Sequence, residues 1–238
     1  MKLVKMSLMA AVLLGSSVYA MDNVNVDGDA RLYYGTTQDD ANMLFDKAGA
    51  VGQSAVRLSG SGDFSDVVSA KATVYGVSTL GLENTLVAET WTGGLKSNYW
   101  FSEAYLQAKM GETTAVAGRI ELDTPLLFTE TWSIAPNTFE SAVVMNQDIP
   151  DTTLVAAFVG RSNAVVIGGG TDNAQNDDAQ SDLFKAIGLH GEGAYAFGAV
   201  NNSWEPLTVQ AWYYLAPHSF DSYWVQADMN FEGVLVGA

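Results

Sequence analysis

Alternation of polar and apolar side chains is the feature that most constrains what this chain can fold into. It is clear in residues 26–33 (VDGDARLY) and again in residues 68–75 (VSAKATVY). Because successive side chains of a strand point to opposite faces, each stretch predicts a strand with one apolar and one polar face. The sequence offers no helix to cover the apolar face, and we therefore expect lipid to cover it.

The first twenty residues have the pattern of an export signal. Lys2 and Lys5 precede an apolar core at 6–14, and small residues follow up to Ala20. This pattern predicts a signal peptide over residues 1–20. No later stretch reaches the roughly 20 apolar residues that a transmembrane helix needs, so a chain that enters the membrane does so with strands. The expected location is the outer membrane, after export through the periplasm.

The charge balance narrows the possible partners. The chain has 27 acidic and 11 basic residues and a formal net charge of -16, which argues against binding to nucleic acid. It contains no cysteine, so disulfides cannot contribute to its stability. No cofactor is expected, and no metal site is predicted, because the acidic residues of the expected outer loops lack the spacing of a calcium loop; these are Asp39, Asp40, Asp172, Asp177, Asp178 and Asp182.

The period-two pattern predicts strands along the whole segment after the signal peptide, with short and long connections in alternation. We treat 162–193 as one long outer loop, because two further strands there would invert this alternation. The pattern stops inside a strand that begins at Val234. The predicted strands cover 24–35, 53–62, 66–77, 99–110, 113–122, 139–147, 152–161, 194–201, 207–215 and 220–230.

Charged and polar residues recur on the polar phase of these strands. We expect them to line a water-filled interior, and they are Arg31, Arg57, Lys71, Glu103, Tyr105, Lys109, Arg119 and Glu121. The segment 123–138 is too apolar for a solvated loop, and its two prolines keep it out of the sheet. It is therefore expected to fold inward and narrow the interior, burying Leu126, Phe128 and Trp132 while carrying Asp123 and Glu130.

Several motifs resemble the OprD-like outer-membrane porins, especially the major porins of epsilonproteobacterial type. They are GRIELDTP at 118–125, FTETW at 128–132, NTFE at 137–140, PDTTLV at 150–155, VNNS at 200–203 and LTVQAWYY at 207–214. The resemblance implies an all-β, antiparallel transmembrane β-barrel of porin type. It also implies passive diffusion of ions and small hydrophilic solutes, with 123–138 as the constriction loop.

The barrel expected over residues 21–238 is incomplete. It has about 10–11 strands, whereas barrels of this kind have roughly 16–18. We therefore expect an amino-terminal part of a longer protein, which the resemblance implies to be a homotrimer in contact with outer-membrane lipid and lipopolysaccharide.

Two other functions are compatible with the same strand pattern. A secreted, soluble β-sandwich that binds carbohydrate or mediates adhesion shares the alternation and the aromatic residues. A small-barrel outer-membrane hydrolase needs a catalytic group, but the two histidines, His190 and His218, lie in predicted loops without a recognisable catalytic setting. We therefore expect a protein that is not an enzyme.

Overall fold

The computed structural model describes residues 21–39, 41–83, 85–92, 95–164, 183–231 and 234–237. The predicted signal peptide, Asp40 and most of the acidic residues of the predicted outer loop lie outside these ranges. Among the described residues, no helix has the length and apolar character needed to cross a membrane.

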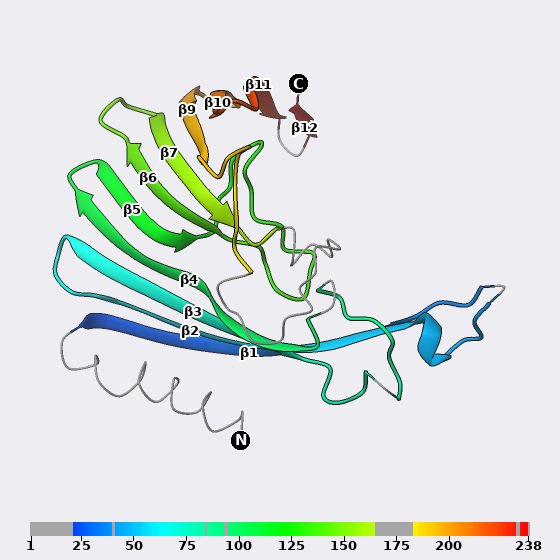
Figure 1. The fold of residues 1–238 in the computed structure, drawn as a ribbon. Coiled ribbons are helices and arrows are strands. Elements are labelled where there is room, and N and C mark those ends of the chain that lie inside the picture. Colours follow the sequence, from blue (N-terminus) through cyan, green and yellow to red (C-terminus); the bar gives the residue numbers. More distant parts are fainter. Residues whose placement is uncertain are drawn as a thin grey trace.

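The described residues form one antiparallel sheet that curves from β1 to β12 (Figure 1). Its path is β1-β2-β3-β4-β5-β6-β7-β9-β10-β11-β12, and the short β8 pairs with the end of β7. The strands are β1 (Asp22–Thr36), β2 (Ala50–Asp63), β3 (Val68–Ser78), β4 (Ser97–Met110), β5 (Thr113–Ile120), β6 (Phe139–Asn146), β7 (Thr152–Ser162), β8 (Lys185–Ala186), β9 (Ala194–Trp204), β10 (Leu207–Ala216), β11 (Phe220–Phe231) and β12 (Val234–Gly237).

The strands agree with the period-two pattern of the sequence. Their ends differ from the predicted ones by at most three residues, at Ala50 for a predicted start at 53 and at Trp204 for a predicted end at 201. The connections at one end of the sheet are short, as at 111–112, whereas three at the other end are long, at 37–49, 79–96 and 121–138. β7 pairs directly with β9, so residues 163–193 connect two neighbouring strands.

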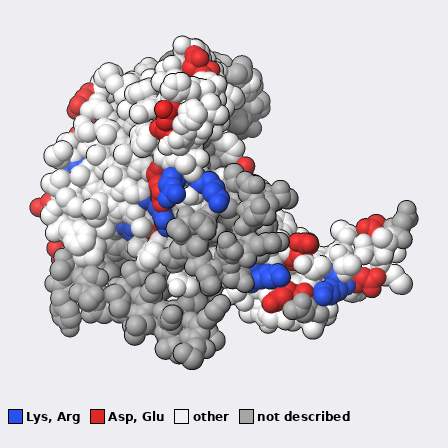
Figure 2. All heavy atoms as spheres, in the orientation of Figure 1, with Lys and Arg blue, Asp and Glu red and all other residues white. Residues whose placement is uncertain are grey.

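The two faces of the sheet differ in polarity. One face exposes apolar side chains on nearly every strand, including Leu32, Val56, Leu106, Val144, Leu154, Phe197 and Val225. The strand register places these positions in one phase; for example, Leu106 lies opposite Ala117, and Val144 lies opposite Ala156. We call this the outer face. Figure 2 accordingly shows a broad uncharged area over β4 to β7.

The opposite, inner face is the one against which residues 121–138 pack. It carries two clusters of buried side chains. The first lies near the long loops and contains Tyr75, Trp100, Ile134, Ala135 and Phe184 among others. The second lies on β5 to β10 and includes Ile120, Val143, Val159, Trp212 and Tyr214. All described strands belong to one sheet, so they do not form the two packed layers of the sandwich alternative.

Candidate functional site: the inner face and its loop

Residues 121–138, which we call the inner loop, cross the inner face of the sheet. Near one end of the loop, the Leu126 amide donates a hydrogen bond to the Tyr214 hydroxyl on β10, at 3.4 Å. Near its other end, the Ile134 carbonyl accepts one from Arg31 Nη1 on β1, at 3.2 Å. Because β1 and β10 lie far apart along the curved sheet, a loop that contacts both must span the space between them.

The inner loop is held in shape by its own polar side chains. The Thr129 amide donates to the Leu122 carbonyl at 2.7 Å, and the Leu122 amide donates to the Thr129 hydroxyl at 3.0 Å. The Asn137 side chain accepts from the Glu130 amide at 2.6 Å and donates to the Phe128 carbonyl at 3.3 Å. These bonds satisfy backbone groups that a sheet would otherwise pair, so the loop keeps a defined shape without becoming a strand.

The side chains that anchor the inner loop are not the predicted ones. Leu126, Phe128 and Trp132 were expected to be buried, but they are 41%, 46% and 57% exposed. The buried side chains are instead Leu122 at the start of the loop and several in its second half, including Ile134 and Ala135. The second half returns to the sheet through Thr138, whose hydroxyl donates to the Ser102 carbonyl at 2.7 Å. In the first half, Leu122 and Leu127 pack into the apolar cluster of β5 to β10, which leaves Leu126 and Phe128 exposed.

The inner loop keeps its charged residues accessible. Asp123 forms a backbone bridge with Phe128, and its side chain is exposed. The Glu130 carboxylate accepts a hydrogen bond from Trp132 Nε1 at 2.8 Å. The ring of Trp132 also lies 6.2 Å from that of Trp91 in the preceding long loop. The loop therefore presents carboxylates and aromatic rings to the space that it crosses.

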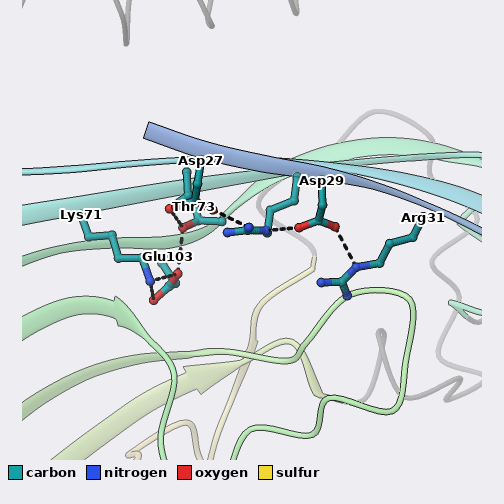
Figure 3. A network of polar contacts seen from close by, with 8 residues as sticks. Asp27, Asp29, Arg31, Lys71, Thr73 and Glu103 are labelled. Atoms are coloured by element: carbon teal, nitrogen blue, oxygen red, sulfur yellow. Dashed lines mark hydrogen bonds and ion pairs between the residues drawn. The ribbon is translucent and has the colours of Figure 1, made fainter. Parts of the chain in front are cut away.

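A network of charged side chains covers the inner face of β1 to β4 (Figure 3). Arg57 on β2 pairs with both Asp27 and Asp29 on β1. Asp29 also accepts from Arg31 Nε at 2.9 Å. The register explains this contact, because Asp29 lies directly opposite Arg57 and cross-strand neighbours share a face.

The network continues on the next two strands. Lys71 Nζ on β3 lies 2.8 Å from Glu103 Oε2 on β4. The Thr73 hydroxyl donates to the same carboxylate at 2.8 Å and lies 2.9 Å from the Ser59 hydroxyl on β2. Glu103 is almost fully buried, so the ammonium group and the hydroxyl replace the water that its charge has lost.

Sequence reasoning found the cations of this network but missed the carboxylates of β1 and the two hydroxyls. Asp27 and Asp29 stand four and two positions before Arg31, in the same strand phase. That phase was the available signal, because it places all three on one face. Which cross-strand partners they have depends on the register, which the sequence pattern does not give.

Arg119 lies apart from this network. The register places it opposite Ala104, one position out of phase with Glu103 and Tyr105. Its guanidinium donates to Glu140 on β6 at 2.9 Å and to the Phe101 carbonyl on β4 at 3.0 Å, and lies 4.0 Å from the centre of the Phe184 ring. Arg119 thus connects β4 to β6 where β5 ends and the inner loop begins.

The remaining predicted residues occupy three different settings. Tyr105 on β4 packs against the apolar cluster of β5 to β10. Lys109 lies one residue from the end of β4, at the short-turn end of the sheet, and has no ion pair within the described part of the chain. Glu121, the first residue of the inner loop, is exposed and lies within electrostatic reach of Glu103, Lys71 and Arg57.

The two histidines meet at the surface. His218 Nδ1 lies 2.8 Å from a carboxylate oxygen of Glu192, and the ring centres of His190 and His218 are 6.2 Å apart. Both histidines are exposed. Within the described ranges, no group of three or more histidine, aspartate and glutamate side chains has an arrangement that could hold a metal ion.

Solved structures of outer-membrane proteins share this fold. OccD3 (OpdP) of Pseudomonas aeruginosa aligns over 92% of this chain and 47% of its own, with a TM-score of 0.64 and 11% identity. OccK1 (OpdK) of the same organism aligns over 90% and 55%, with a TM-score of 0.64 and 13% identity. A BenF-like porin from Pseudomonas fluorescens Pf-5 aligns over 92% and 56%, with a TM-score of 0.67 and 10% identity.

These comparisons confirm the predicted fold class. The chain has the all-β, antiparallel fold of the outer-membrane porin barrels and spans about half the length of the solved structures that it matches. Within the described residues no pairing joins β1 to β12, so the sheet is open there. No family model matches the sequence, and neither does any curated protein. The epsilonproteobacterial type therefore stays a prediction.

Proposed function

We propose that this chain forms part of the wall and the constriction of an outer-membrane porin, through which ions and small hydrophilic solutes diffuse. The observation that carries the proposal is the inner loop, which touches β1 on one side and β10 on the other and so narrows the space inside the curved sheet. A loop across a polar interior sets the size and charge of what passes.

The polarity of the two faces supports this function. The outer face exposes apolar side chains on nearly every strand, as a wall in contact with acyl chains requires. The inner face carries the charged network of β1 to β4, as a water-filled passage requires. A soluble protein with the same outer face would expose a far larger apolar area to water than monomers usually do.

The residues proposed to line the passage belong to the inner face of the sheet and to the inner loop. They are Arg31, Arg57, Lys71, Glu103, Tyr105, Lys109 and Glu121, with Asp123, Phe128, Glu130 and Trp132 on the inner loop. Arg119 has a different proposed role, that of holding β4 to β6 beside the base of the loop. Asp27 and Asp29 join the set because they neutralise Arg57 and Arg31.

Location and assembly belong to the same proposal. We expect export by a cleaved signal peptide, a position in the outer membrane among lipid and lipopolysaccharide, and a homotrimer for the complete barrel. Sedimentation of the detergent-solubilised protein tests the trimer, and amino-terminal sequencing of the protein from outer membranes tests the cleavage.

The test of the function is conductance in planar lipid bilayers. Protein purified from outer membranes, and shown to be folded by its heat-modifiable migration on gels, is expected to give stepwise increases in current. The variant that lacks residues 124–136 of the inner loop is expected to give larger steps, because the passage is then wider. Folded protein that gives no conductance would contradict the proposal.

A further inference from the structure

Every cation of the inner-face network has a carboxylate partner. Arg57 pairs with Asp27 and Asp29, Arg31 pairs with Asp29, and Lys71 pairs with Glu103. Three cations thus face three carboxylates, and the formal charge of the network is zero. A passing ion therefore meets little net field from these six charged groups.

The inner loop has a different charge balance. It contains Glu121, Asp123 and Glu130, and it contains no lysine, arginine or histidine. Among the residues that the structure describes, none of these three carboxylates has an ion-pair partner. Glu130 accepts a hydrogen bond from Trp132 Nε1, but this donor is neutral and leaves the charge in place. The loop therefore carries three uncompensated negative charges.

Glu121 interacts electrostatically with the charged network of the wall. The charges of Glu103, Lys71 and Arg57 act on it. Lys71 does not neutralise it, because Lys71 Nζ is held 2.8 Å from Glu103 Oε2. Glu121 also begins the loop directly after Ile120, the last residue of β5, so its position is fixed by the end of a strand.

We propose that the inner loop makes the passage selective for cations, through the charges of Glu121, Asp123 and Glu130. The inference rests on the proposed porin function and names its solute class, small ions and solutes with net positive charge. Where a passage is narrow and its walls have a low dielectric constant, uncompensated charge raises the local concentration of counter-ions. The neutral network of β1 to β4 does not oppose this effect.

The experiment measures reversal potentials across a planar bilayer with a KCl gradient. The unaltered protein is expected to pass potassium in preference to chloride. Glu121→Gln removes one charge at nearly constant volume and is expected to move the reversal potential toward zero. The combined variant Glu121→Gln, Asp123→Asn and Glu130→Gln is expected to lose the preference.

Glu112→Gln is the matched control, because it is the same substitution in the short turn between β4 and β5, at the other end of the strands. It is expected to leave the reversal potential unchanged. Preference for chloride in the unaltered protein, or an equal response of the Glu121 and Glu112 variants, would overturn the selectivity inference. Absence of any current from folded protein would instead overturn the porin function, so the two failures are distinguishable.

Discussion

The inner face of β1 to β4 and the inner face of β5 to β10 are built differently. On β1 to β4, charged side chains form a network of ion pairs along the middle of the strands. On β5 to β10, apolar side chains such as Val143, Ala157 and Trp212 form a packed cluster. Both halves belong to one sheet with the same alternation, so the difference comes from what each half faces.

The inner loop explains the difference. Leu122 and Leu127 of the loop pack into the apolar cluster of β5 to β10, so this half of the inner face is covered. The inner face of β1 to β4 instead carries the charged groups of the network, from Asp27 on β1 to Glu103 on β4. Such groups need water or a partner of opposite charge. The loop also packs against the other half, where Ile134 and Ala135 join the cluster of Tyr75 and Trp100. The charged network itself lies outside both apolar clusters, so we place the proposed passage along it.

Removal of a large ring from the covered half has the largest expected effect. Trp212→Ala is expected to lower the free energy of unfolding by about 3–5 kcal/mol, because Trp212 is 7% exposed and its loss leaves a cavity. Trp204→Ala is the control, since Trp204 is 62% exposed. Urea titration of the protein in lipid vesicles measures both. Equal losses for the two variants would mean that the cluster does not support the sheet.

A charge on the outer face tests which solvent covers it. Val225 on β11 is 73% exposed, and Val225→Lys is expected to cost about 2–4 kcal/mol if the side chain lies near the centre of the bilayer. The neighbouring Gln226→Lys, on the inner face, is expected to cost far less. The same urea titration compares them. A Val225 variant as stable as the Gln226 variant would show that water, and not lipid, covers the outer face.

Loss of one partner from the charged half has an intermediate effect. Glu103→Gln is expected to cost about 1–3 kcal/mol, because Lys71 then keeps its charge without a partner while a third of its side chain remains accessible to water. Lys71→Met in the same chain is expected to restore part of the stability. The double-mutant cycle measures the coupling between the two residues. A coupling energy of zero would mean that the pair adds nothing to the wall.

Acidification of the outer loops has the smallest expected effect. The amides of Ala41 and Asn42 donate to the Asp39 carboxylate and hold its pKa below the ordinary value of 3.8. A lowered folded-state pKa means that the bonds are fully present above pH 3.8 and are lost as the pH falls through the folded-state pKa. Hydrogen exchange at these two amides, corrected for intrinsic rates, is expected to accelerate there. The Asp39→Ala variant lacks the accepting carboxylate, so its two amides are expected to exchange at this faster rate at every pH.

The sequence predicted the sheet well because strand alternation is a local property. The strand from Phe139 to Asn146 and the long outer connections follow directly from side chains that alternate between two solvents. The sequence also indicated that residues 123–138 differ from the other loops. It gave the wrong anchors for that loop, because burial of Leu126, Phe128 and Trp132 depends on which distant strands the loop meets.

Arg119 is a second case in which the sequence pattern did not predict the contacts of a side chain. Its strand phase in the sequence grouped it with Arg57 and Lys71. In the structure, Gly118 has a φ of 136°, and the register places Gly118, not Arg119, opposite Tyr105. Arg119 bonds instead to Glu140 and to the Phe101 carbonyl. A positive φ of this kind favours glycine, and the alternation of side chains along a strand does not predict it.

The sequence by itself determined that this chain makes amphipathic strands with long connections at one end, since each strand needs only its own residues to separate polar from apolar faces. The tertiary structure decided which charges neutralise one another, where the inner loop rests and which carboxylates stay uncompensated. These are pairwise properties of residues that lie from 2 to more than 100 positions apart in the chain, and the register of the sheet together with the path of the inner loop decides which of them meet.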